Sequence, residues 1–212
     1  MFTLTDSLHF VKEVDYKEAV SYGKNSFFKK QKYLIHHYTA GRSFESSLER
    51  FTKDPLAKAS AHFLIGREGQ AVQLVPLNRP AWHAGSDSSW KPADQVFSDV
   101  HLNFYSIGIE IDNHGPLAFV AGKGWTTWYG APVPSGEVVE VDPAMPGAFN
   151  RRYWHAFTQD QIEPVLVLSV ALVRGLGLVD ILGHSDIAPG RKQDPGPAWP
   201  LAHIQSLVFG RE

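Results

Sequence analysis

The chain has 212 residues, of which 43% are hydrophobic and 20% charged, and its formal net charge is -2 at pH 7. This composition excludes a disordered or fibrous chain, and the near-neutral charge argues against a nucleic-acid partner, because phosphate binding normally leaves a basic stripe. Cysteine is absent, which excludes disulfides and thiolate metal clusters and leaves histidine and carboxylate groups as metal ligands. No linker or low-complexity tract divides the sequence, so we predict a single domain over residues 1–212.

No targeting or membrane segment is predicted. Charged residues interrupt the first 20 positions, so the apolar core of a signal peptide is missing. The longest apolar run, residues 162–173, contains Glu163 and Ser169 and falls short of the about 20 apolar residues that a membrane span needs. We therefore expect a cytoplasmic protein, which would leave the cytosol only if something else released it.

The first predicted element is a buried strand. Residues 1–31 show no regular pattern, whereas residues 32–39 are mostly aromatic and aliphatic. The end of this strand carries His36 and His37. Because adjacent strand residues point to opposite faces of a sheet, only one of the two histidines can face a given site.

A helix and a hairpin are predicted next. The hydroxyl of Ser43 can cap a helix that includes residues 47–51. Residues 60–65 and 71–75 have the character of strands, and the turn at residues 67–70 contains a glycine. This arrangement predicts a β-hairpin.

Two long stretches are predicted to be irregular. The first covers residues 82–100 and begins with Trp82 and His83. The second covers residues 115–152, is rich in glycine, proline and aromatic residues, and could include a short hairpin over residues 137–141. Long ordered loops in compact domains are often functional, but the sequence of the second stretch indicates no role for it.

A strand predicted over residues 105–112 lies between these two stretches and places Glu110 among apolar neighbours. An isolated buried charge is too unfavourable to keep, so this carboxylate requires a partner. One interpretation is a structural salt bridge to Lys192, and the other is a functional site.

The C-terminal part begins with a capping box formed by Thr158 and Gln161, which starts a mostly apolar helix that should end at Gly175. A short strand over residues 178–182 and a short helix over residues 201–209 are also predicted. Strands and helices in this order indicate an α/β fold with one central mixed β-sheet flanked by helices.

The loop over residues 183–197 holds the densest group of reactive side chains. Its proline and glycine residues exclude a regular helix. His184 and Asp194 are suitable zinc ligands, and Lys192 could stabilise an anionic transition state. We expect Asp186 to cap backbone N–H groups within the loop.

Taken alone, any one of the ten histidines is more often structural than functional. The combination of a histidine pair at a strand end, a glutamate in a core strand and a His/Lys/Asp loop after a strand is more informative. Strand ends can converge at one edge of a sheet, where α/β proteins commonly place their sites. The sequence therefore indicates a mononuclear zinc hydrolase with its site at the strand ends, in a surface cleft.

Four blocks of sequence, residues 34–40, 81–85, 106–110 and 183–197, carry a resemblance to a known family. The chain resembles the zinc-dependent N-acetylmuramoyl-L-alanine amidases of the type-2 amidase group, relatives of peptidoglycan recognition proteins and of the amidases of T7-like phages. The resemblance runs from about residue 32 to residue 202, and the last block is highly specific. It implies a Zn²⁺ cofactor and a peptidoglycan or muropeptide substrate.

The resemblance also implies a ligand set. His184 and Asp194 occupy the places of the family's second and third zinc ligands. The first is either His36 or His37, and the resemblance favours His37, which stands two residues before Thr39.

Further roles follow from the same resemblance. Glu110 matches the catalytic glutamate, which would deprotonate the attacking water and pass the proton to the leaving amine. Lys192 matches the lysine that would stabilise the oxyanion. Trp82 and His83 would border the substrate cleft, whereas His62 matches no ligand position, and we expect it to form a hydrogen bond within the core.

The leading hypothesis is hydrolysis of the amide between N-acetylmuramic acid and L-alanine. One alternative is a muropeptide-binding module without activity, as in relatives that have lost zinc ligands, and another is a zinc hydrolase of a different amide. The complete ligand set favours the amidase. The sequence leaves open whether the substrate is intact wall or a small anhydro-muropeptide, whether the setting is host recycling or phage lysis, and what the oligomeric state is.

Overall fold

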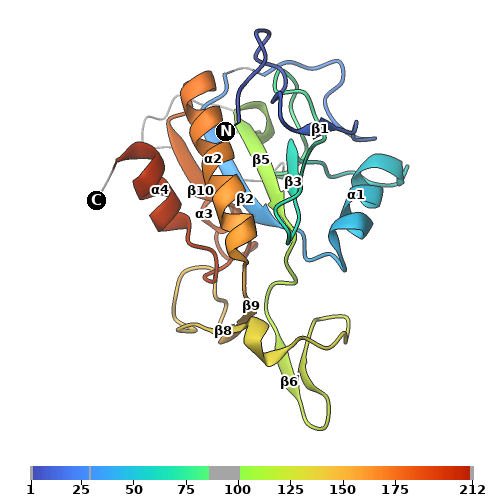
Figure 1. Ribbon diagram of the computed structural model, residues 1–212, viewed down its shortest axis with the longest axis vertical. Helices are drawn as coiled ribbons and strands as arrows, with labels where there is room; N and C mark the ends of the chain where they lie inside the picture. The colour runs from blue at the N-terminus through green and yellow to red at the C-terminus, as the bar shows by residue number, and fades with distance from the viewer. Residues whose placement is uncertain (1, 29, 86–100, 211–212) are drawn as a thin grey trace.

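A six-stranded mixed β-sheet forms the centre of the molecule in the computed structural model, which describes residues 2–28, 30–85 and 101–210 (Figure 1). The strand order is β1-β4-β3-β5-β2-β10. Neighbouring strands run parallel except for the antiparallel pair β3 and β4. The strands are β1 (Asp15–Tyr16), β2 (Tyr33–Tyr38), β3 (Phe63–Ile65), β4 (Ala71–Gln73), β5 (Ser106–Ile111) and β10 (Asp180–Gly183).

Helices cover both faces of this sheet, which confirms the predicted fold class. On one face, α2 (Gln159–Leu176) and α4 (Leu201–Phe209) pack against apolar side chains such as Leu34 and Ile107. On the other face, α1 (Phe44–Lys53) buries one side against β3 and β4 (Figure 1). Alternating side chains of each strand therefore enter different cores, which requires the nearly continuous apolar sequence of the central strands.

The predicted caps start both long helices. Ser43 and Ser46 form a capping box at α1, and Thr158 and Gln161 form one at α2. The predicted end of α2 at Gly175 is wrong by two residues, because the left-handed residue that ends the helix is Gly177 (φ 66°). Among the residues described, no helix is long and apolar enough to cross a membrane.

The predicted hairpin is confirmed, although its strands are shorter than expected. Gly69 in the turn has φ 80°, which favours glycine. Residues 60–62 lie outside β3, because the backbone N–H of Ser60 donates to Trp82 O and its hydroxyl accepts from Trp82 N. The expectation that residues 1–31 are entirely irregular is wrong, since β1 pairs with β4 there.

Residues 115–157 form a lobe that projects beyond one end of the sheet (Figure 1). Its elements are the hairpin of β6 (Ala118–Val120) and β7 (Gly124–Thr126), the short 3₁₀-helix η2 (Ser135–Glu137), and the antiparallel pair of β8 (Val138–Glu140) and β9 (Tyr153–His155). The predicted hairpin over residues 137–141 is wrong. Residues 138–140 pair with residues 153–155 instead, and local sequence patterns do not reveal such a distant partner.

The loop over residues 183–197 begins as a helix rather than as an irregular segment. β10 leads directly into α3, a single turn over His184–Ile187, so the predicted absence of helix is wrong for these four residues. The Asp186 carboxylate accepts a hydrogen bond from Gly183 N at 2.7 Å, which is the capping role predicted for it. The short 3₁₀-helix η1 (Leu102–Phe104) leads into β5.

Candidate metal centre and cleft

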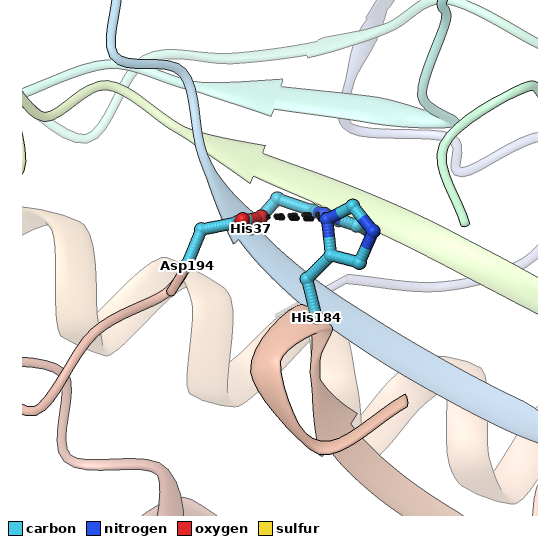
Figure 2. A group of neighbouring side chains, drawn as sticks. All are labelled: His37, His184 and Asp194. Atoms are coloured by element: carbon cyan, nitrogen blue, oxygen red, sulfur yellow. Dashed lines mark hydrogen bonds and ion pairs between the residues drawn. The ribbon is translucent and has the colours of Figure 1, made fainter. Parts of the chain in front are cut away.

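Three side chains from separate parts of the chain converge at one end of the sheet. His37 comes from β2, His184 from α3 and Asp194 from the loop that follows (Figure 2). Asp194 Oδ2 lies 2.9 Å from His37 Nδ1 and 2.9 Å from His184 Nδ1, and the two Nδ1 atoms are 3.0 Å apart. All three residues are buried. Among the described residues, this is the group of histidine and carboxylate side chains that could hold a metal ion.

The neighbouring His36 lies on the opposite face of the sheet. Its Nδ1 accepts a hydrogen bond from Trp199 Nε1 at 3.1 Å, and its Nε2 lies 3.3 Å from the Ser169 hydroxyl. Burial lowers the pKa of His36 to about 3, so the ring is neutral. Of the two histidines left open by the sequence, His37 is therefore the one beside His184 and Asp194, because the β-pleat separates adjacent side chains.

A buried hydrogen-bond chain fixes the tautomer of His37. His83 Nε2 faces two acceptors at 3.3 Å, Ser106 O and the Ser106 hydroxyl oxygen, whose own proton is donated to Leu102 O. The Nε2 atom of His83 therefore carries the proton, and its Nδ1 accepts from His37 Nε2 at 3.0 Å. The lone pair of His37 Nδ1 is consequently directed toward His184 and Asp194.

Gly108 of β5 makes room for these hydrogen-bonded histidines and also binds a third one. A Cβ atom on Gly108 would come within 2.6 Å of the His83 ring, so only glycine fits there. The Gly108 N–H donates to His62 Nδ1 at 3.0 Å, and His62 Nε2 lies 3.0 Å from Arg79 O. The hydrogen-bonded core position predicted for His62 is confirmed.

The charge states of His37 and Asp194 suit a cation. Burial, followed by the charge of His184, lowers the pKa of His37 to about 4. Burial alone would raise the pKa of Asp194, but its close contacts with His184 and His37 outweigh this effect and hold that pKa far below its usual value. The unprotonated His37 Nδ1 and an ionised carboxylate oxygen lie 2.9 Å apart. These two electron-rich atoms repel each other unless a cation lies among them, and the N,N,O donor set fits zinc.

A cavity of about 490 Å³ opens beside the three residues. Its lining includes Glu110 and Lys192 together with His37, His184 and Asp194. Glu110 is the direct neighbour of His37 across the β2–β5 ladder. The cavity and the convergence agree with the predicted cleft at the strand ends.

Glu110 has an unusual environment for a carboxylate. Its Oε2 atom is buried without a hydrogen-bond partner, and among the described residues Glu110 forms no ion pair. Burial and, secondarily, the charge of Asp194 raise the pKa of Glu110 well above its ordinary value, while Lys192 partly opposes this shift. The alternative of a direct salt bridge between Glu110 and Lys192 is therefore not what the structure contains.

The other two predicted site residues occupy different positions. Trp82 lines the cavity and packs its ring edge-on against Phe104, with 5.9 Å between ring centroids. His83 also borders the cavity but is only 7% exposed and lies behind His37. The rest of the predicted irregular stretch, residues 86–100, lies outside the described residues.

The cleft lining also includes residues that were not singled out from the sequence, among them Phe149, Arg191 and Gln193. Arg191 and Gln193 flank Lys192, so their proximity could have been inferred from the loop itself. Phe149 comes from the lobe, and no local signal marks it.

Comparison with known proteins agrees with this geometry. A family model described as N-acetylmuramoyl-L-alanine amidase matches residues 28–197. The chain belongs to the N-acetylmuramoyl-L-alanine amidase family. This confirms the resemblance carried by the four sequence blocks.

Two curated members of the family from Escherichia coli (strain K12) are similar to the chain. N-acetylmuramoyl-L-alanine amidase AmiD is 30% identical over 188 residues, covering 84% of this chain and 54% of AmiD. The 1,6-anhydro-N-acetylmuramyl-L-alanine amidase AmpD is 29% identical over 153 residues, covering 71% of this chain and 59% of AmpD. The chain thus spans a little over half the length of these relatives.

Solved structures of amidases have the same fold. The complex of E. coli AmiD with the substrate anhydro-N-acetylmuramic acid-L-Ala-D-γ-Glu-L-Lys superimposes with a TM-score of 0.59 at 28% identity, covering 84% of this chain and 57% of AmiD. A selenomethionine AmpD structure gives a TM-score of 0.61 at 24% identity and covers 97% of this chain and 98% of AmpD, a likeness that concerns the fold alone.

Proposed function

We propose that this protein is a zinc-dependent amidase that hydrolyses the amide between N-acetylmuramic acid and L-alanine in peptidoglycan or muropeptides. The observation that carries the proposal is the convergence of His37, His184 and Asp194 beside Glu110 in one cleft. The relatives AmiD and AmpD are amidases by name, and the AmiD complex contains a muropeptide as substrate. These similarities support the same bond class here.

In this proposal His37, His184 and Asp194 hold the zinc ion. Zinc supplies a Lewis acid that polarises a carbonyl and lowers the pKa of water. The protein supplies a neutral imidazole at His37 and an ionised carboxylate at Asp194, which are the protonation states that metal binding requires. We propose that His83 is a positioning residue, because its hydrogen bond to His37 Nε2 keeps the Nδ1 lone pair available.

Glu110 is proposed as the general base and acid. Burial raises the pKa of Glu110, which makes this carboxylate a stronger base than an exposed one for accepting a proton from water and passing it to the leaving amine. The buried Oε2 atom without a partner is available for such a proton.

Lys192 is proposed as the group that stabilises the oxyanion formed when the scissile carbonyl is attacked. Its side chain lines the cleft beside Asp194. Loss of one such donor typically lowers the rate by about 10²–10³-fold. Trp82, on the same cleft, is proposed to contact the substrate.

The decisive experiment is incubation of the purified, zinc-loaded protein with anhydro-N-acetylmuramoyl-tetrapeptide, followed by mass spectrometry. We expect release of the free tetrapeptide, loss of the activity on chelation and its return on addition of zinc. Binding without release would instead support a non-catalytic muropeptide-binding module. Release of acetate without free peptide would support a zinc hydrolase of another amide.

The size of the substrate can be tested with the same protein. Activity on intact sacculi, compared with activity on purified muropeptides, separates a wall-degrading enzyme from a recycling enzyme. The cytoplasmic location stays a prediction from the sequence, as does a single amidase domain over residues 1–212.

A further inference from the structure

Phe149 of the lobe lines the same cleft as Glu110 and Lys192. Its side chain is 45% exposed, so burial in the core does not account for its position. A large apolar ring exposed inside a cleft is typical of a ligand-binding surface.

The backbone holds Phe149 in a conformation that its residue type rarely adopts. Phe149 has φ 52°, and the following residue, Asn150, has φ 60°. Residues other than glycine seldom occupy this left-handed region, and such outliers often occur at ligand-binding positions. The preceding Ala148 is fully buried, and its N–H and C=O bond to Met145 O and Arg151 N. The turn therefore fixes the direction of the ring without burying it.

The lobe that carries Phe149 is fastened to the end of β2. The exposed indole of Trp128 donates from Nε1 to Ala40 O at 3.0 Å, and His114 Nδ1 lies 3.0 Å from Gly41 O. Ala40 itself lines the cleft. The lobe is thus anchored at the cleft rim, so that Phe149 is preorganised for a ligand rather than free to swing away.

A second anchor lies where the lobe returns to the sheet. Glu137 accepts hydrogen bonds from Arg67 Nη2 and His155 Nε2, both at 3.0 Å. Arg67 Nη1 also donates to Ala156 O at 3.0 Å. The lobe is therefore held at both of its ends, which strengthens the case for a fixed wall.

Different side chains of the cleft suit the peptide and the sugar of a muropeptide. The cationic side chains of the cleft are Arg191 and Lys192, and the Arg191 guanidinium lies against Gly85, 3.1 Å from where a Cβ would stand. These two cations suit the carboxylates of the peptide. The sugar ring instead presents a flat face of C–H groups, which packs favourably on the electron-rich face of an aromatic ring.

We propose that Phe149 is a sugar-contacting residue, whose ring packs against the apolar face of the N-acetylmuramic acid ring. This inference rests on the proposed function, and deepens it by placing a contact to the sugar on the lobe. In this proposal Glu110 and Lys192 act on the reacting amide, and the Phe149 ring does not. Its effect is therefore expected in substrate binding and not in the chemical step.

The test compares Phe149→Ala with the wild-type protein on two substrates, N-acetylmuramoyl-tetrapeptide and lactoyl-tetrapeptide, which keeps the scissile amide but lacks the sugar ring. We expect kcat/KM to fall about 10-fold on the first substrate, mainly through KM, and to stay unchanged on the second. Phe149→Tyr should retain wild-type values on both substrates. Phe149→Asn, whose residue type tolerates the left-handed backbone, should match Phe149→Ala.

Phe119→Ala is the matched control, because Phe119 lies on the same lobe, is 65% exposed and is absent from the cleft lining. Phe119→Ala should leave kcat/KM unchanged on both substrates. Equal loss on both substrates in Phe149→Ala, or no loss on either, would overturn the proposal. If wild-type protein cleaved no muropeptide, the proposed function would fail. Calorimetric binding of N-acetylmuramic acid would still decide the contact: weaker binding to Phe149→Ala would support it, and equal binding would overturn it.

Discussion

The end of the sheet and the lobe both line the cleft, but the sheet end contributes buried polar side chains whereas the lobe contributes an exposed aromatic ring. At the sheet end, His37 is 1% exposed, and its polar atoms are directed at partners a few ångströms away. On the lobe, Phe149 and Trp128 are 45% and 69% exposed, and they are held by backbone and rim contacts. Under the two proposals, the sheet end holds the reactive groups and the lobe adds surface for the substrate.

Strand pairing explains why the reactive groups belong to the sheet. β5 and β10 flank β2 in parallel, so His37 stands opposite Glu110 and β10 delivers the chain to His184. Side chains on such a scaffold are held closely enough for metal binding and proton transfer. The lobe is anchored at both of its ends and by the buried Trp154, and a contact between an aromatic ring and a sugar requires less exact placement than metal binding.

The largest expected difference lies between the two histidines of β2. His37→Ala should abolish both bound zinc and turnover, because it removes one proposed ligand. His36→Ala should retain one equivalent of zinc and lower only the melting temperature, since it leaves the Trp199 N–H without its acceptor. Zinc content by elemental analysis, together with thermal denaturation, checks both variants. Loss of zinc from His36→Ala, with His37→Ala unaffected, would reverse the assignment of the two faces.

A smaller effect is expected at the buried neighbour of His37. His83→Ala removes the acceptor that fixes the His37 tautomer, and it should weaken zinc affinity by about 10–100-fold. Trp82→Ala is the adjacent control and should leave zinc affinity unchanged. Competition with a chromophoric chelator measures both. Wild-type affinity in His83→Ala would show that the hydrogen bond does not position the ligand.

The smallest effect concerns the junction of the lobe with the sheet. Burial lowers the pKa of His155 to about 4, below the value of about 6.5 for the unfolded chain. As pH falls from 6.5 to 4, the unfolded chain takes up a proton that the folded protein does not, so stability is lost in this window. The melting temperature of the metal-free protein should therefore fall over this range, and less steeply in His155→Gln. If the melting temperature fell equally steeply with pH in both proteins, the titration of His155 would not be the cause.

Much of the sheet end could be predicted from the sequence. The apolar runs around His37 and Glu110, the capping box at Thr158 and the glycine turn of the hairpin are local signals with local causes. The loop after β10 was predicted with its reactive residues, although its first helical turn was not. Local patterns also left the choice between His36 and His37 open, because that choice depends on which face the helices cover.

The lobe and the support of the site could not be predicted in the same way. β8 pairs with β9 across a connection of irregular sequence, and β1 is only two residues long. The contact of His83 with His37 spans 46 positions along the chain. The left-handed backbone of Phe149 is a conformation that its residue type rarely adopts, so residue preference does not predict it. Each of these features depends on tertiary contacts that periodicity and propensity do not record.

The central claim is that one group of residues holds zinc and a separate carboxylate moves the proton. Bound zinc and turnover of anhydro-N-acetylmuramoyl-tetrapeptide, measured side by side in Asp194→Ala and Glu110→Gln, test this claim most directly. We expect Asp194→Ala to lose both, whereas Glu110→Gln should retain one equivalent of zinc and turn over about 10²–10⁴-fold more slowly. Equal zinc content in the two variants would contradict these separate roles of Asp194 and Glu110.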